Sequence, residues 1–313
     1  ACKVGDNDDS FKSMKIVLIL LSFNLCLSVC HGSGLKSIWW NVARLAVPIG
    51  ESLPQTSEEI ERNSEVNREL ISIISNENPD VLMIGEAVPT AFSESFKAKA
   101  REVYPYQQFF RYNPSDKVFG FYILAKVPPK NIVKQPLHWF PLNLEAEYKD
   151  KWLSPFPDDP HSRDYIQLDF ETNEGNLSVV PIHLMMPWVQ MIDQKGVLKA
   201  SFAMFYDASH PQMIQLQNLI KKLRDLKNSG VSFFAMGDFN FPKKVLSQRT
   251  MGFFFLSTFF DELGSTGGTF KVTKYQIRTP LDLDQAYGSG IENAVLRRLS
   301  YSHSDHFPIQ LTF

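Results

Sequence analysis

The hydrophobic pattern of the chain consists of short apolar runs, separated by polar turns and by two longer segments with helical spacing. Continuous apolar runs of strand length indicate strands that are buried on both faces. Such strands are predicted at residues 37–43, 81–87, 117–126, 164–171, 176–184, 231–236, 280–289, 294–302 and 306–313. Strands mixed with helices predict an α/β protein built on packed sheets.

Two segments carry the signals of amphipathic helices. Residues 56–75 place Ile60, Leu70 and Ile74 near one face, after a threonine and an acidic first turn. Residues 209–230 have a serine before the helix, a proline in its first turn and a glycine just past its end. These are the residues that begin and end helices most often.

The chain after residue 32 has no internal repeat and no Gly/Ser-rich linker, which predicts a single domain over residues 33–313. Two stretches, residues 135–162 and 185–208, do not fit the strand and helix pattern and are rich in aromatic residues. Long loops in compact domains are usually functional. These two could form a wall for a base, touch a membrane surface, or simply cover the domain.

The N-terminal segment resembles a targeting sequence. Residues 14–32 contain one lysine, a short apolar run and small residues near Cys30, a pattern typical of a secretory signal peptide. Residues 1–13 are interpreted as a segment upstream of it. We therefore expect a secreted or periplasmic protein. The stretch LSVC also resembles a lipobox, which leaves a lipoprotein anchored through Cys30 as an alternative.

The positions of the cysteines and the net charge exclude some catalytic mechanisms and one mode of nucleic-acid binding. All three cysteines, Cys2, Cys26 and Cys30, lie in this leader, so the remainder of the chain has no thiolate for zinc or for nucleophilic attack. The 32 basic and 34 acidic residues give a net charge of -2, so no global basic field attracts nucleic acid. Any polyanion must be recognised by a local patch.

Polar residues that suit catalysis stand at the ends of the apolar runs. The Gly-Asp-Phe-Asn after residue 236 could be only a turn, because glycine and asparagine tolerate positive φ. The other runs, however, end in a similar way. The residues concerned are Asn41, Glu86, His183, Asp238, Asn240, Asp284, Asp305 and His306. If these ends meet, they form an oxygen-rich cluster that favours Mg²⁺, Mn²⁺ or Ca²⁺ over zinc.

The order of these motifs resembles the endonuclease/exonuclease/phosphatase superfamily. WNVA, IGEA, PIHL, GDFN, LDLDQAYGS and SHSDHFPI follow one another over nearly the whole chain after the leader. The resemblance implies a DNase I-like fold, a four-layered α/β/β/α sandwich in which two mixed sheets lie face to face. It also implies a metal-dependent site at one end of the sandwich.

The same resemblance implies how a metal and a phosphate would be held. Glu86 matches the principal metal carboxylate, and Asn41 matches the asparagine that helps to position metal and phosphate. Asp305 matches an aspartate that supports the metal region. Arg163 is interpreted as the arginine that contacts the phosphate, although its HSRD context is equally typical of a solvated loop.

The catalytic roles follow in the same way. Asp238 would orient or deprotonate the attacking water, and Asn240 would contact the phosphate. His306, oriented by Asp284, would bind the scissile phosphate, and His183 would act near the leaving group. As an alternative, His183 could be a buried core histidine with a structural partner.

The sequence also departs from the family pattern. Gln285 and Ala286 follow Asp284, where a histidine or tyrosine is usual. Residues 117–126 contain no glutamate to orient a histidine, and the disulfide of pancreatic-type DNases is impossible here. A strict DNase I assignment is therefore not made.

The substrate is left open by the sequence. We predict a phosphodiesterase, endonuclease-like in the simplest case and acting as a monomer. A sphingomyelinase-like or inositol-phosphate phosphoesterase is the first alternative. The second is an inactive family member that serves as a binding module, although the complete polar set argues against loss of activity.

Overall fold

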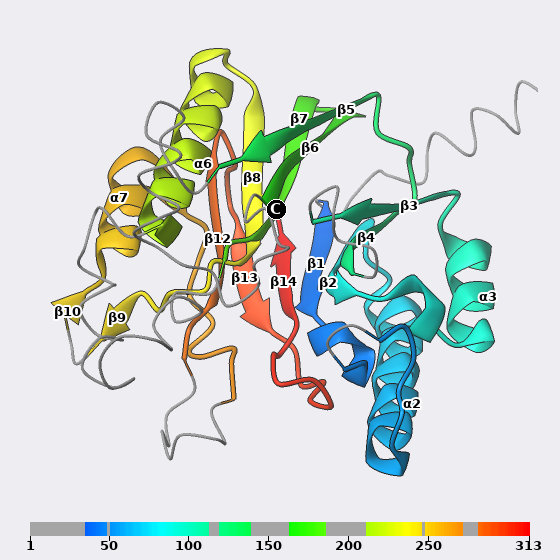
Figure 1. Cartoon of the computed structure of the whole chain (residues 1–313). Coiled ribbons are helices and arrows are strands. Elements are labelled where there is room, and N and C mark those ends of the chain that lie inside the picture. The colour runs from blue at the N-terminus through cyan, green and yellow to red at the C-terminus, as the bar shows by residue number, and fades with distance from the viewer. Residues whose placement is uncertain are drawn as a thin grey trace, which may run out of the picture. The chain divides into compact units, whose positions relative to one another are not determined.

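Two six-stranded β-sheets face each other in the computed structural model of the protein (Figure 1). The structure describes residues 35–48, 51–112, 119–138, 163–185, 211–245, 248–271 and 281–313. The first sheet has the strand order β13-β14-β1-β2-β4-β3, and the second has the order β11-β12-β8-β7-β6-β5. The pairs β1–β2 and β7–β8 are parallel and the other pairs are antiparallel, so both sheets are mixed, as predicted.

The elements of the first half of the chain build most of the first sheet and its helices. They are β1 (Lys36–Asn41), η1 (Ala43–Ala46), α2 (Ser57–Ser72), η2 (Ile73–Glu77), β2 (Val81–Ala87), η3 (Pro89–Ala91), α3 (Glu94–Val103), β3 (Tyr106–Arg111) and β4 (Gly120–Ala125). The second sheet begins with β5 (Asn131–Leu137), β6 (Arg163–Thr172) and β7 (Gly175–His183). The remaining elements in chain order are α6 (Pro211–Asn228), β8 (Ser232–Asp238), β9 (Lys244–Val245), β10 (Gln248–Arg249), α7 (Met251–Phe259), β11 (Asp261–Glu262), β12 (Asp284–Ser289), β13 (Val295–Arg298) and β14 (Ile309–Thr312). Of these, β8, β11 and β12 complete the second sheet, and β13 and β14 complete the first.

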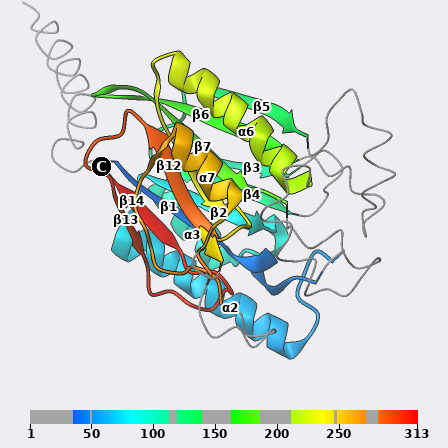
Figure 2. The ribbon, with the colours of Figure 1, turned by 90° about the vertical axis from the view of Figure 1, so that its left-hand side faces the viewer.

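Three hydrophobic clusters hold these layers together. One joins the first sheet to α2 and α3, a second fills the space between the sheets, and the third joins the second sheet to α6 and α7. Figure 2 shows α6 and α7 lying over the outer face of the second sheet. Neighbouring side chains of a strand point to opposite faces, so Trp39 enters the cluster between the sheets while Trp40 faces α2. The predicted four-layered sandwich is confirmed.

Strand pairing brings the polar ends together, though not quite as predicted. The parallel pairs align Asn41 with Gly85 and His183 with Asp238, so these strands end at one edge. Asp284, by contrast, opens β12 and lies opposite Asp238 because β12 and β8 are antiparallel. Likewise, His306 precedes β14, which is antiparallel to β1. The polar rim of the sandwich therefore has two sources. The parallel strands contribute residues at their C-terminal ends, and the antiparallel strands β12 and β14 contribute residues at or before their N-terminal ends.

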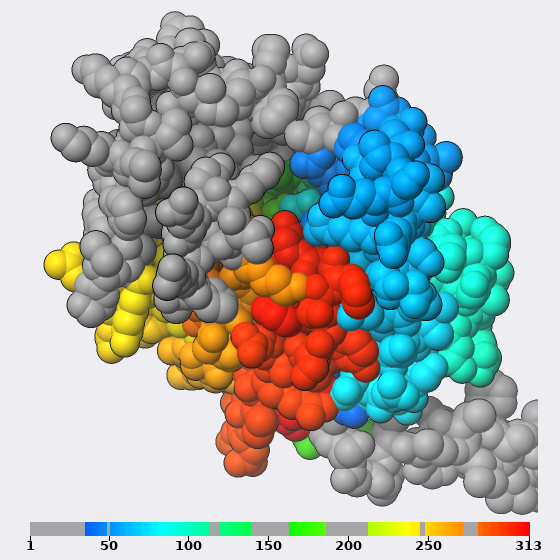
Figure 3. All heavy atoms as spheres, turned by 90° about the horizontal axis from the view of Figure 1, so that it is seen from below, coloured from blue at the N-terminus to red at the C-terminus, as the bar shows by residue number. Residues whose placement is uncertain are grey.

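The rim is also supported from outside the sheets. Figure 3 shows the C-terminal segment (red) against the α2 region (blue). Glu69 of α2 accepts hydrogen bonds from the backbone N–H groups of Ser302 and His303 at 2.9 and 3.0 Å. The segment that carries His306 is thus tied to a helix from the start of the chain.

The first long helix follows the sequence prediction closely at its start. Thr56 is the N-cap, and its hydroxyl accepts from the N–H of Glu59 while the Glu59 carboxylate accepts from the N–H of Thr56. The helix ends three residues earlier than predicted, where a π-turn takes over. Ile60, predicted to face the core, is exposed, whereas Leu70 and Ile74 are buried.

Removal of the cap should lower stability measurably. We expect Thr56→Ala to reduce the free energy of unfolding by about 1 kcal/mol, because the N–H of Glu59 loses its acceptor. Urea unfolding followed by circular dichroism would measure this. Glu58→Ala, in the same helical turn but outside the capping box, is the control and should change stability by less than about 0.5 kcal/mol.

Several elements were not anticipated. The structure places residues 135–137 in the edge strand β5, whereas the sequence analysis assigned them to a loop; Pro136 and the polar composition of β5 hide its signal. Helices α3 and α7 and strand β3 were missed as well. The signal peptide, the cysteines, residues 139–162 and residues 186–208 of the aromatic stretches lie outside the described residues, so the predictions about them stay predictions. Among the described helices, none is long and apolar enough to span a membrane.

Candidate active site

The end of β8 places two of the predicted catalytic residues. A Cβ at Gly237 would lie 2.0 Å from the carbonyl oxygen of Ile182, so only glycine allows β7 and β8 to approach this closely. Gly237 therefore acts within the strand, not as the turn residue expected from the sequence. The next residue, Asp238, is buried, and its Oδ1 accepts from the N–H of Asn240 at 2.8 Å. Asn240 has a φ of 55°, and its side-chain amide donates to the carbonyl of Leu184 at 2.7 Å.

A buried aspartate–histidine pair forms the second part of the site. His306 Nδ1 lies 2.7 Å from Asp284 Oδ2, and the indole N–H of Trp39 donates to Asp284 Oδ1 at 2.8 Å. Thr269 Oγ1 accepts from the Asp284 N–H, and the indole of Trp40 donates to the His306 carbonyl at 2.9 Å. Burial alone would lower the pKa of His306, but the carboxylates of Asp284 and Asp238 raise it to about 10. The imidazole is therefore a cation at neutral pH.

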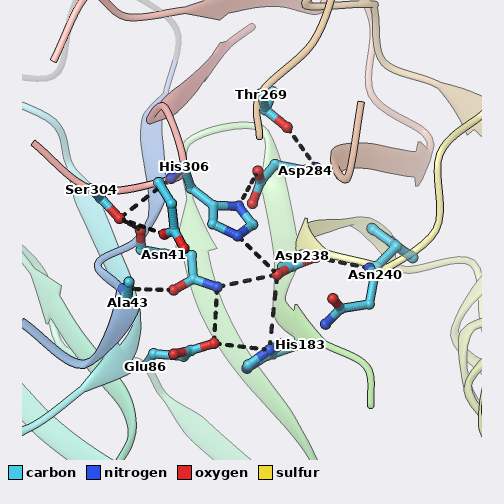
Figure 4. A network of polar contacts seen from close by, with 12 residues as sticks. Asn41, Ala43, Glu86, His183, Asp238, Asn240, Thr269, Asp284, Ser304 and His306 are labelled. Atoms are coloured by element: carbon cyan, nitrogen blue, oxygen red, sulfur yellow. Dashed lines mark hydrogen bonds and ion pairs between the residues drawn. The ribbon is translucent and has the colours of Figure 1, made fainter. Parts of the chain in front are cut away.

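Asp238 lies between this pair and the rest of the site (Figure 4). Its Oδ2 is 3.6 Å from His306 Nε2 and 3.1 Å from the amide nitrogen of Asn41. Burial raises the pKa of Asp238 to about 7, with the charge of Asp284 adding to the effect and His306 opposing it. Such a pKa suits a group that accepts a proton at neutral pH.

Asn41 and Glu86 form the more open part of the site. The Asn41 amide donates to Glu86 Oε1 at 3.3 Å, and its Oδ1 accepts from the N–H of Ala43 at 3.0 Å. The backbone of Glu86 has a φ of 50°, and its N–H donates to the hydroxyl of Tyr112. The Glu86 side chain is 20% exposed, in contrast to the buried Asn41.

His183 is held as a neutral imidazole. Its Nε2 lies 3.6 Å from Glu86 Oε1 and 3.9 Å from Asp238 Oδ2, and its ring packs edge-on against Tyr112. Burial lowers its pKa well below the ordinary value, and the charges of Arg163, His306 and Arg44 act in the same direction. Nδ1 has no hydrogen-bond partner among the described residues.

Arg163 and Asp305 flank this cluster. Arg163 is the first residue of β6, and its guanidinium lies over the Tyr112 ring, 4.6 Å from the centroid. Asp305 is half-buried, and its Oδ1 lies 3.2 Å from the hydroxyl oxygen of Ser304. Ser304, which sequence reasoning missed, donates to the carbonyl of Asn41 at 2.8 Å. Its position two residues before His306 in SHSDH was the available signal.

The donor atoms suit a hard divalent cation. The carboxylates of Asp238 and Asp284 contact the His306 cation, and that of Glu86, which is 20% exposed, lies beside the neutral His183, so hard oxygen donors line the site. Asp238, Asp284 and His306 also have potential ligand atoms within 4.8 Å of one another. In that group, however, both Asp284 oxygens already accept hydrogen bonds and His306 is protonated. The open carboxylate of Glu86 is the better anchor for a cation.

The four-layered sandwich, with carboxylates and histidines gathered at one end, agrees with the family that the sequence resembles. The sequence model of the Endonuclease/Exonuclease/phosphatase family matches residues 38–306. The chain belongs to this family. None of the curated proteins compared with it gives a significant match.

Solved structures of the same fold are distant in sequence. A functionally unknown conserved protein from Enterococcus faecalis V583 shares 17% identity with a TM-score of 0.56, covering 88% of this chain and 98% of that one. Truncated TDP2 from Caenorhabditis elegans shares 16% identity with a TM-score of 0.55, and the match covers 89% of this chain and 96% of that one. Beta toxin 275-280 from Staphylococcus aureus shares 17% identity with a TM-score of 0.55, and the match covers 88% of this chain and 99% of that one.

Proposed function

We propose that the protein is a divalent-metal-dependent phosphodiesterase that hydrolyses a phosphoester by in-line attack of water. The single observation that supports this most is the contact of the Asp284–His306 pair with Asp238, beside Asn41 and Glu86. A proton acceptor, a fixed cation and an open carboxylate thus lie together. The endonuclease-like reading is the simplest form of this proposal, and a secreted protein remains its expected setting.

The residues divide the reaction between them. Asp238, with a pKa near 7, takes a proton from the attacking water as the new P–O bond forms. The His306 imidazolium, fixed by Asp284, hydrogen-bonds a phosphate oxygen and stabilises the charge that develops there. Neutral His183 donates its ring N–H as a hydrogen bond to the phosphate or to the leaving oxygen, which departs as the old P–O bond breaks and takes up a proton from solvent. The second amide hydrogen of Asn240 Nδ2 and the guanidinium of Arg163 donate to the substrate phosphate.

Glu86, assisted by Asn41, would hold the cation, with Asp305 supporting the region around it. When bound, a divalent ion such as Mg²⁺ would neutralise phosphate charge and stabilise the transition state. Mn²⁺ or Ca²⁺ would fit the same oxygen donors.

Hydrolysis by residues 33–313 tests the proposal. We expect Mg²⁺-dependent cleavage of one member of a panel of plasmid DNA, sphingomyelin vesicles and an inositol polyphosphate. EDTA should abolish the activity, and Asp238→Asn, which keeps the size of the side chain but not its proton acceptor, should lower kcat by at least about 100-fold. Asp225→Asn, on the exposed face of α6, is the control.

The panel also separates the alternatives. Cleavage of vesicles or of the inositol polyphosphate alone would replace the endonuclease-like reading by a phospholipase or phosphatase. No metal-dependent hydrolysis of any of the three would contradict the proposal and favour a binding module.

A further inference from the structure

Arg44 has no counterpart in the motifs that predicted the site, yet it lies at the open side of it. Its Nε is 3.8 Å from Glu86 Oε2, and the two side chains are 23% and 20% exposed. The residues behind them, including Asn41, Asp238 and His183, are buried. Among the described residues of the site, Glu86 and Arg44 are thus more exposed to solvent than the groups behind them.

The backbone that carries Arg44 is strained. The four residues of η1, none of them glycine, have φ values of 46°, 58°, 55° and 62°. Left-handed conformations are unfavourable for L-residues because Cβ crowds the following carbonyl. Runs of such residues persist only where the surroundings impose them, and they cluster at functional sites.

The surroundings do impose this turn. Leu45 is fully buried in the cluster under α2, and the side-chain amide of Asn63 donates to the Leu45 carbonyl at 3.0 Å. The Val47 N–H also donates to the Arg44 carbonyl at 3.0 Å. Leu45 thus points into the core while its neighbour Arg44 is directed to the site opening.

The Arg44 guanidinium is oriented without using its hydrogen-bond donors. Its central carbon lies 5.3 Å from the centre of the Phe119 ring, a cation–π distance. Phe119 packs edge-on against Tyr112, and the guanidinium of Arg163 lies over the Tyr112 ring. Among the described residues, the Arg44 side chain makes no hydrogen bond, and its only ion pair is the one to Glu86. Within the part of the chain that the structure describes, the N–H donors of this guanidinium are thus not used by other hydrogen bonds.

We propose that Arg44 is a phosphate-binding residue at the entrance of the site, and that it shares the Glu86 carboxylate with the divalent cation. A planar guanidinium with free N–H groups matches phosphate oxygens in a bidentate way. Its positive charge near Glu86 also opposes a second cation there. The inference rests on the proposed function for the identity of the ligand. It adds a residue that sets substrate affinity and metal affinity in opposite directions.

Binding measurements with Mg²⁺ alone and with inorganic phosphate in the presence of Mg²⁺, by titration calorimetry, test this. In Arg44→Gln we expect the Kd for phosphate to rise about 10-fold, because charged hydrogen bonds are lost. The Kd for Mg²⁺ should fall about fivefold, because a nearby positive charge is removed. Arg44→Lys should keep the wild-type Mg²⁺ affinity and lose part of the phosphate affinity, because lysine retains the positive charge but cannot donate two parallel hydrogen bonds as a guanidinium does.

The matched control is Arg68→Gln, which removes the same charge from an exposed arginine of α2 and should change neither constant. The proposal is overturned if Arg44→Gln leaves phosphate affinity within twofold of wild type, if wild type binds no phosphate, or if the variant weakens phosphate and Mg²⁺ together, as a purely structural role would. If wild type hydrolyses no phosphoester but the two opposite shifts are found, the proposed function fails and the role of Arg44 stands.

Discussion

Replacement of His306 by alanine should lower kcat for phosphoester hydrolysis by about 1000-fold. The imidazolium is the only cation in direct contact with both Asp238 and Asp284 among the described residues, so its loss removes the charge that faces the phosphate. KM should change far less, because the interaction strengthens as charge develops in the transition state. Steady-state kinetics with the substrate identified from the panel would measure both constants.

The control for this variant is His303→Ala. His303 lies three residues away, is 47% exposed and pairs with Glu69 on α2, outside the site. Its replacement should leave kcat within about twofold of wild type, since single surface ion pairs contribute little. His306→Gln, which restores a side-chain amide donor, should recover part of the activity. Equal losses in the His303 and His306 variants would contradict the assignment.

Substitution of Gly237 by alanine should reduce the free energy of unfolding by about 3 kcal/mol or more, because overpacking against a rigid backbone cannot be relieved by a rotamer change. The added Cβ would lie 2.0 Å from the Ile182 carbonyl oxygen, at a φ of 157° that side chains rarely adopt. Relief requires β7 and β8 to separate. His183 and Asp238, which are paired across these strands, would then move apart and activity should fall as well.

Gly230 provides the comparison for this experiment. It has a positive φ of 76°, but a Cβ there would meet no atom within 4 Å. Gly230→Ala should therefore cost about 1 kcal/mol from backbone strain alone. Chemical unfolding of the two variants separates strain from steric clash, and similar losses at both positions would argue against the close approach at Gly237.

The fold class predicted from the sequence is confirmed, and the sequence also singled out polar residues that the structure brings together, whereas their catalytic roles stay predictions. Asn41, Glu86, His183, Asp238, Asp284 and His306 were identified because polar residues at the ends of apolar runs are easily seen. The antiparallel start at Asp284 could not be inferred, because strand direction depends on pairing partners that are distant in the chain. Edge strand β5 was missed because its exposed, polar residues give no apolar signal.

The contacts that support the site were the least predictable. Ser304 and Thr269 are common residue types whose importance lies in one hydrogen bond each, to Asn41 and to Asp284. Gln285, noted as a departure from the family pattern, is fully buried and donates to the carbonyls of Phe241 and Asp282. Its hydrogen bonds connect the strand that carries Asp284 to the loop after Asp238. Gln285 therefore has a structural role at the position where the family usually has histidine or tyrosine.

The two adjacent tryptophans of β1 link folding to chemistry. Trp39 and Trp40 point to opposite sides of the first sheet, yet each donates its indole N–H to one member of the Asp284–His306 pair. Asp284 begins a strand of the second sheet and His306 lies just before β14 of the first, so the pair is aligned only when both sheets have closed around β1. A partly folded chain therefore has no assembled active site. Under the proposed function, hydrolysis therefore requires that both sheets be folded.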